Sequence, residues 1–296
     1  MLNALDHLIV GVRDLAAAEA ATTRLLGREP SWRGAHPGAG TANVLYRLDN
    51  TYLELLAPEG EGGAGRLLGE HLEARGEGLL GLAFATDDAE ACRGALASRG
   101  LEPAPLAEGS GRECDRGDER SWRQVLLPVA KTRGPLLFAI EHRSPEDRLP
   151  PAPLAAGAGD AAAVHGLDHV VVRTADPEAA IALYGEGLGL RLALDRRFDD
   201  WGVRLLFFRV GGLTVEVAAA LGGGGELAAP ADRDELWGAS WRVADPEAAR
   251  ARLLEAGFDV SEVRRGRKPG TRVCTVRDEP CGVATLLIGP EPSSDG

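Results

Sequence analysis

A repeated phrase constrains this chain more than any other feature of its sequence. Residues 5–14 read LDHLIVGVRD, and 162 positions later residues 167–176 read LDHVVVRTAD. The same offset, without a gap, aligns YRLDNTYLELLA at 46–57 with FRVGGLTVEVAA at 208–219. Two matches at one offset indicate an internal duplication, which must be recognised before any local pattern is interpreted.

The duplication also aligns identical polar residues of the two copies: His7 with His169, Arg47 with Arg209, and Glu54 with Glu216. A further pair of segments, 84–100 and 241–257, resemble each other at a slightly different offset. The chain therefore reads as four short units in the order A, B, A′, B′.

The length of 296 residues favours two domains rather than one. A stretch rich in Pro, Gly and Ala with no apolar period separates the halves. We therefore predict a first domain over 1–145, a linker over 146–164 and a second domain over 165–292.

Each unit opens with an apolar run of five to eight residues, which is typical of a buried strand. An Asp follows, which can cap a helix by accepting a hydrogen bond from a backbone N–H. A short amphipathic helix then ends at a glycine: Gly27, Gly100, Gly189 or Gly257. Further strands follow, with turn signals at Asn50 and at Gly211-Gly212 that suit tight hairpins. The pattern predicts an α+β fold.

Composition limits the partners. Lys and Arg total 33 against 45 Asp and Glu, so the net charge is -12, which disfavours nucleic acid and anionic lipid as partners. No signal-peptide pattern or membrane-spanning apolar run is present, so we expect a soluble, cytoplasmic protein. The four cysteines have no metal-type spacing and are expected to be reduced thiols.

Units that open with xDHxxxxV and close with a Glu in an apolar strand resemble the vicinal oxygen chelate superfamily of glyoxalases, extradiol dioxygenases, epimerases and bleomycin-type resistance proteins. The first half resembles a glyoxalase-like domain, because HPGAGTAN at 36–43 and the hairpin after it match that domain's pattern. The resemblance implies four βαβββ modules that pair into two cupped half-barrel domains.

The resemblance also implies a divalent metal ion in a cup, held by residues of the first and last strands of each module. In the first half it assigns His7, Glu54 and Glu141 as ligands, while Gly81 occupies the fourth slot. In the second half only His169 and Glu216 fill such slots. These two residues are a weak metal site, a remnant of duplication or a pair in a substrate pocket.

Structural explanations exist for the same residues. A strand histidine can bond to a backbone carbonyl or a carboxylate, and a buried Glu can bond to an arginine such as Arg47. His36, Thr41, Asn43 and Arg47 are candidates for binding substrate, although the HPGAGTAN stretch also carries ordinary turn residues.

The resemblance implies two kinds of function. One is a lyase or isomerase that uses a divalent metal ion and an oxygen-rich small molecule, with Glu54 as the catalytic carboxylate. The other is a protein that binds or sequesters a small molecule without chemistry. Ring-cleaving dioxygenase activity is disfavoured, because the second first-strand histidine is missing at Gly81. Either a monomer or a homodimer suits four modules.

Overall fold

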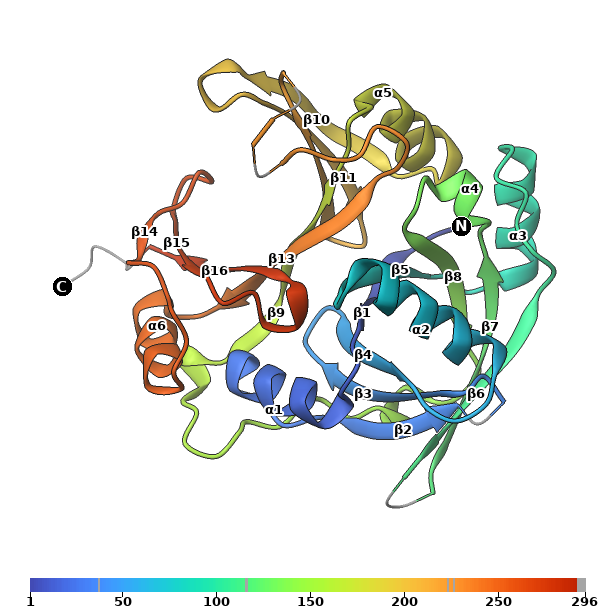
Figure 1. The fold of residues 1–296 in the computed structure, drawn as a ribbon, viewed down its shortest axis with the longest axis horizontal. Helices are drawn as coiled ribbons and strands as arrows, with labels where there is room; N and C mark the ends of the chain where they lie inside the picture. The colour runs from blue at the N-terminus through green and yellow to red at the C-terminus, as the bar shows by residue number, and fades with distance from the viewer. Residues whose placement is uncertain (37, 115–116, 223, 226, 292–296) are drawn as a thin grey trace. The chain divides into compact units, whose positions relative to one another are not determined.

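The computed structural model describes residues 1–36, 38–114, 117–222, 224–225 and 227–291. The first half contains β1 (Ala4–Gly11), α1 (Leu15–Leu26), β2 (Trp32–His36), β3 (Thr41–Arg47), β4 (Tyr52–Pro58), α2 (Gly63–Arg75), β5 (Gly78–Ala85), α3 (Ala89–Ser98), β6 (Ala107–Glu113), β7 (Glu119–Leu126), α4 (Val129–Thr132) and β8 (Leu136–His142) (Figure 1).

The second half contains β9 (Val164–Arg173), α5 (Pro177–Ala180), the π-helical segment η3 (Ile181–Gly187), β10 (Arg191–Phe198), β11 (Val203–Val210), β12 (Leu213–Ala220), β13 (Glu235–Val243), α6 (Pro246–Glu255), β14 (Arg264–Arg265), β15 (Thr271–Val276) and β16 (Ala284–Pro290). Short 3-10 turns span Glu146–Arg148, Asp160–Ala162, Asp199–Trp201 and Pro280–Gly282. In the described ranges, no helix is long and apolar enough to cross a membrane.

The strands form two eight-stranded sheets. One is closed into a barrel in the order β1-β4-β3-β2-β6-β7-β8-β5, and the other is open in the order β10-β11-β12-β9-β13-β16-β15-β14. The fold is therefore mixed α and β, as predicted, but the first sheet is a closed barrel where a half-barrel was expected. Closure removes the two free edges that an open sheet exposes.

The predicted helix starts are confirmed by hydrogen bonds. In each case an aspartate side chain accepts from a backbone N–H in the first turn: Asp14 before α1, Asp88 before α3, Asp176 before α5 and Asp245 before α6. The cap satisfies a donor that has no partner inside the helix. Helix α1 ends as predicted at Gly27, whose φ of 67° is left-handed.

The predicted hairpin between β11 and β12 is also confirmed. Its two-residue turn, Gly211-Gly212, has φ values of 53° and 82°. Val210 pairs with Leu213 on either side of it. Two successive positive φ angles match the twist of the flanking strands, and glycine adopts them without strain.

The folded chain forms two compact units, which differ from the four short sequence units. Each compact unit is assembled from three segments of the chain. The first unit comprises residues 1–9, 79–148 and 169–237, and the second comprises 10–78, 149–168 and 238–296. In the first unit, β6, β7 and β8 form an antiparallel ribbon, as do β10, β11 and β12. In the second unit, β2, β3 and β4 form an antiparallel ribbon that carries part of the candidate site.

The stretch predicted as a linker packs closely within the second unit. Leu149 and Ala152 are buried, and Arg28 donates hydrogen bonds to the backbone oxygens of Ala152 and Val164. Apolar residues do not recur at regular intervals in this stretch, because its backbone is mostly irregular and is held by hydrogen bonds such as those from Arg28.

Candidate functional site

The β2–β4 ribbon brings four polar side chains of the second unit onto one face. Thr41 pairs with His36 across the β2–β3 turn, and Glu54 on β4 pairs with Leu45 on β3. Because alternate strand residues face the same side, Thr41, Asn43 and Leu45 share a face with Glu54. His36, Thr41 and Asn43 are three of the four predicted substrate-binding residues. They therefore lie on the same face as Glu54, the predicted catalytic residue.

These side chains form a continuous hydrogen-bonded chain, which we call the polar cluster (His36, Thr41, Asn43 and Glu54). The Thr41 hydroxyl lies 2.9 Å from Nδ1 of His36. The Asn43 amide nitrogen lies 3.4 Å from Nε2 of His36 and donates to Oε1 of Glu54 at 2.7 Å. Pro37, in the same sequence motif, lies outside the described residues.

The polar cluster is buried. Thr41 and Asn43 are each 4% exposed, and Glu54 is 8% exposed. The amide oxygen of Asn43 is buried and has no hydrogen-bond partner among the described residues. A buried acceptor without a donor costs about 1–3 kcal/mol, which a hydrogen bond from a group outside the described residues would recover.

Glycines bring the loop before β3 against the start of α2. A Cβ added to Gly65 would lie 2.0 Å from the backbone oxygen of Gly40, and one added to Gly62 would lie 2.2 Å from that of Ala39. Gly40 has a φ of 73°. The turn explanation for part of HPGAGTAN is therefore also correct, because this close approach requires glycine.

His7, in the first unit, is held by a carboxylate. Its Nδ1 lies 2.6 Å from Oδ1 of Asp6, whose Oδ2 lies 3.0 Å from Nε2 of His142. Burial would raise the pKa of the Asp6 carboxyl, but hydrogen bonds from His142 and His7 lower it well below its ordinary value. The Asp6 carboxylate beside Nδ1 holds the orientation of the His7 ring.

Sequence reasoning missed this arrangement. The His142 side chain is 31% exposed, and its ring bonds to Asp6 across 136 residues. The available signals were the acidic residue before His7 and the histidine that ends β8. Neither signal identifies the partner, because the contact depends on how β1 and β8 pack.

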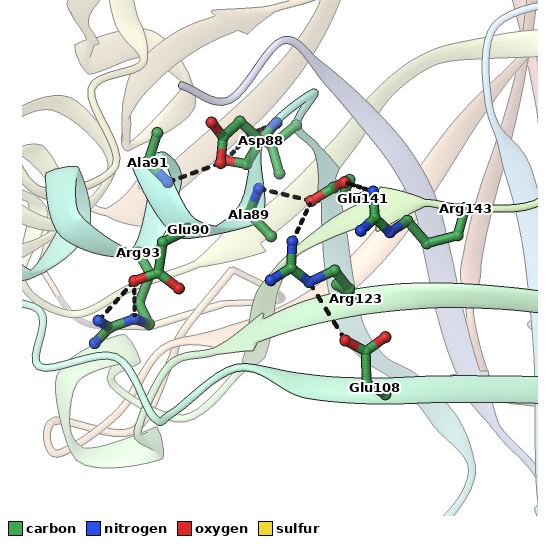
Figure 2. Close-up of polar contacts among 10 residues, drawn as sticks. Asp88, Ala89, Glu90, Ala91, Arg93, Glu108, Arg123, Glu141 and Arg143 are labelled. Carbon is green, nitrogen blue, oxygen red and sulfur yellow. Dashed lines mark hydrogen bonds and ion pairs between the residues drawn. The ribbon is translucent and has the colours of Figure 1, made fainter.

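Glu141 is held by nitrogen donors of the first unit (Figure 2). Its Oε2 accepts from the backbone N–H of Ala89 at 2.9 Å and lies 3.6 Å from Nη1 of Arg123. Its Oε1 accepts from Nη1 of Arg143 at 2.7 Å. Oε2 therefore links β8 to the first residue of α3, while Oε1 holds the side chain of Arg143.

Strand alternation explains this orientation. Phe138 of β8 makes an edge contact with the His7 ring, with the centroids 5.8 Å apart. Glu141 lies three residues further along β8, so its side chain leaves the opposite face of the strand. That face meets α3, where the side chain binds the helix start.

The predicted metal ligands do not all fit an ion. His7 presents a suitable ring, but both oxygens of Glu141 are bonded to N–H donors. Within the described ranges, no group of three or more His, Cys, Asp or Glu side chains could hold a metal ion. His7 and Glu141 belong to the first unit and Glu54 to the second.

Gly81 occupies the position where the family resemblance implies a fourth metal ligand, and the backbone there leaves no space for a side chain. A Cβ built there would lie 2.6 Å from the backbone oxygen of Leu136 on the paired strand β8. The β5 and β8 backbones therefore approach each other where a ligand side chain would have to begin.

Arg47 and the second-half pair lie elsewhere. Arg47 donates from its guanidinium to the backbone oxygen of Leu149, so it helps to hold the stretch predicted as a linker. His169 and Glu216 do come together, with Nε2 and Oε2 3.5 Å apart. Both belong to the first unit and stand on the neighbouring parallel strands β9 and β12.

Two family models match the chain. One described as a glyoxalase-like domain matches residues 5–186, and one described as the glyoxalase/bleomycin resistance protein/dioxygenase superfamily matches 168–275. Over 97 residues the chain is 33% identical to the ethylmalonyl-CoA/methylmalonyl-CoA epimerase of Cereibacter sphaeroides. That match covers 32% of this chain and 72% of the epimerase.

Solved structures share the fold at low identity. A mutant of 4-hydroxymandelate synthase from Streptomyces coelicolor has a TM-score of 0.70 and 14% identity, with 98% of this chain and 93% of that chain covered. A hypothetical protein from Staphylococcus aureus has a TM-score of 0.63 and 11% identity, with 96% and 98% covered. These matches describe the architecture alone, since one fold hosts many activities.

Proposed function

The chain belongs to the glyoxalase-like domain family of the vicinal oxygen chelate superfamily, and from this premise we propose that it binds a small oxygen-rich molecule at the polar cluster. The observation that carries the proposal is the buried amide oxygen of Asn43, which lacks a donor among the described residues. A hydroxyl or other donor of a ligand satisfies it. His36 and Thr41 supply further polar atoms on the same face.

We propose that the chemistry is of the lyase or isomerase type, with Glu54 moving a proton. Its carboxylate is buried on an apolar strand and is oriented by the Asn43 amide. A positioned carboxylate can remove a proton from the carbon beside a carbonyl group and return it to the same or a neighbouring atom. Polar groups beside it stabilise the negative charge that develops on the carbonyl oxygen.

A divalent metal ion remains a prediction from the family resemblance. Such an ion supplies Lewis-acid stabilisation of substrate oxygens where it is bound. His7, fixed by Asp6, suits a ligand role, whereas Glu141 is bonded to α3 and to two arginines. The metal assignment of Glu141 is therefore the weakest member of the predicted set.

Binding without chemistry is the second candidate function. It is favoured by Gly81, where the backbone of Leu136 leaves no room for a further ligand side chain. Under either candidate we also propose that the chain has two domains, 1–145 and 165–292, built from four modules. We propose that the protein is a monomer or a homodimer. Residue 292, the last of the second proposed domain, lies outside the described residues.

Solvent exchange separates the two candidates. The protein is incubated with methylmalonyl-CoA in D₂O, with and without added Mg²⁺, Mn²⁺ or Co²⁺, and deuterium uptake is followed by mass spectrometry. The epimerase similarity over 97 residues motivates this substrate. We expect uptake that Glu54→Gln lowers at least a hundredfold and that Glu61→Gln, an exposed control, leaves unchanged.

Calorimetric titration supplies the other arm. Saturable binding without deuterium uptake would favour the non-catalytic candidate. Neither uptake nor binding, or uptake that persists in Glu54→Gln, would contradict the assignment of the polar cluster as the site for this thioester.

A further inference from the structure

Asp234 is a buried carboxylate of the first unit that the proposed chemistry does not use. It is 1% exposed and stands directly before β13. Its Oδ1 accepts from the Thr174 hydroxyl at 2.6 Å and from Nε of Arg133 at 3.2 Å. Its backbone N–H donates to the backbone oxygen of Arg133 at 2.6 Å. Asp234 therefore joins the turn after α4 to the residue that follows β9.

The turn after α4 approaches Asp234 closely. Arg133 is a non-glycine residue with a left-handed φ of 58°, and Gly134 follows it with a φ of 124°. A Cβ added to Gly134 would lie 2.8 Å from the backbone oxygen of Asp234, so only glycine permits this approach. The turn thus brings the Arg133 guanidinium against the buried carboxylate.

The Arg133 guanidinium uses only part of its fork of N–H donors on this carboxylate. In the same unit, Nε and Nη2 of Arg204 each lie 2.8 Å from a different oxygen of Asp195, which closes the fork. At Asp234, by contrast, Nη2 of Arg133 and Oδ2 of Asp234 are buried and have no hydrogen-bond partner among the described residues. Because the N–H groups of the fork are parallel, Nη2 points toward the same carboxyl group as Nε. We call Nη2 of Arg133 and Oδ2 of Asp234 the open fork.

A third unpaired group belongs to Tyr184 on the π-helical segment η3. This residue is 0% exposed, and its hydroxyl has no hydrogen-bond partner in the part of the chain that the structure describes. Burial raises the pKa of the hydroxyl, the charge of Asp234 raises it further, and the charge of Arg133 lowers it. The two residues whose charges act on the hydroxyl are those of the open fork, so it lies near them. Helices of the π type are rare and occur mostly at functional sites.

We propose that the open fork and the Tyr184 hydroxyl bind one internal water molecule. The water accepts a hydrogen bond from Nη2 of Arg133, donates one to Oδ2 of Asp234 and makes a third with the hydroxyl. About three hydrogen bonds are usual for a buried water. Arg133 comes from the first half of the chain, and Tyr184 and Asp234 come from the second half. The water therefore ties segments of both halves together within the first unit.

The charges at the site select a neutral molecule. Arg133 repels a cation at Nη2, and Asp234 repels an anion at Oδ2. The molecule must also accept one hydrogen bond and donate another, because Nη2 is a donor and Oδ2 is an acceptor. Water is the smallest neutral molecule that does both, which suits a site whose polar atoms are buried. The proposal does not depend on the polar cluster, which lies in the second unit.

Tyr184→Phe tests the proposal through the sign of its effect on stability. If the hydroxyl is bonded to water, its removal loses a hydrogen bond, and we expect the equilibrium constant for unfolding to rise about fivefold. If the hydroxyl is unpaired, its removal relieves a buried polar group and the constant falls instead. Urea unfolding measures the change.

Tyr46→Phe is the matched control, because Tyr46 is also 0% exposed. Its hydroxyl lies 2.9 Å from Oγ1 of Thr23 and donates to the backbone oxygen of Glu19 at 3.0 Å. Removing this bonded hydroxyl should raise the equilibrium constant for unfolding. Under the proposal, Tyr184→Phe shifts the constant in the same direction.

A high-resolution crystal structure of the wild type gives the second readout. We expect an isolated density peak within hydrogen-bond distance of Nη2 of Arg133, Oδ2 of Asp234 and the Tyr184 hydroxyl. That peak, together with a raised unfolding constant for Tyr184→Phe, would support the proposal. An unchanged or lower constant for Tyr184→Phe would overturn it. So would the absence of the peak, or a direct contact between Nη2 and Oδ2 that closes the fork.

Discussion

Replacing Glu141 tests whether this residue anchors a helix or binds a metal. Glu141→Ala leaves the buried backbone N–H of Ala89 without its acceptor, which costs about 1–3 kcal/mol. Arg143 is half-exposed, so losing that ion pair adds about 1 kcal/mol at most. Arg123 keeps a partner in Glu108 at 3.4 Å. The free energy of unfolding should fall by about 1–4 kcal/mol in total.

Glu141→Gln sharpens the expectation. The amide retains a carbonyl oxygen for the Ala89 N–H and loses only the charged contacts, so the loss should be about 1 kcal/mol. Glu90→Ala is the matched control on the same helix. Glu90 is exposed and forms an ion pair with its neighbour Arg93 (Figure 2). Its effect should stay below about 0.5 kcal/mol.

Urea unfolding followed by circular dichroism measures these differences. With a slope of about 3 kcal/mol/M, Glu141→Ala should lower the midpoint by about 0.3–1.3 M and Glu90→Ala by less than about 0.2 M. Any divalent metal that co-purifies with the wild type should remain in Glu141→Ala and be lost in His7→Ala. Unchanged stability together with loss of metal in Glu141→Ala would refute the anchoring role.

Three further predictions follow from close packing, burial and thiol exposure. Gly65→Ala should destabilise the protein, because the added Cβ would lie 2.0 Å from the backbone oxygen of Gly40. Gly69→Ala in the same helix contacts nothing and should stabilise the protein by about 0.5–1 kcal/mol. Thermal unfolding of both variants measures these changes. Burial raises the pKa of Asp234 above its ordinary 3.8, against the effects of Thr174 and Arg133, so the folded state binds a proton more tightly than the unfolded state. Wild-type stability relative to Asp234→Asn should therefore rise as the pH falls through the folded pKa toward 3.8; a difference that does not change across that range in urea titrations would contradict this. A thiol reagent at pH 8 should react quickly with Cys114 alone, because Cys92, Cys274 and Cys281 are partly or fully buried with raised pKa values, about 11 for Cys274; rapid reaction of a second thiol in native protein would count against it.

The sequence by itself determined the local elements and the polar cluster. Aspartates at the predicted helix starts accept hydrogen bonds from first-turn N–H groups, and Gly211-Gly212 makes the predicted hairpin turn, because these features depend on residues a few positions apart. His36, Thr41, Asn43 and Glu54 lie within one antiparallel ribbon. Strand alternation and short turns are enough to bring them onto one face.

Only the tertiary structure decides which groups Glu141 and Asp6 contact. Glu141 binds Ala89 across 52 residues and Asp6 binds His142 across 136, so local periodicity carries no information about either contact. Alternation predicts two faces for β8, but only the packing of α3 decides which face receives a helix start. The closure of one sheet likewise depends on contacts between distant strands, which a single sequence does not specify.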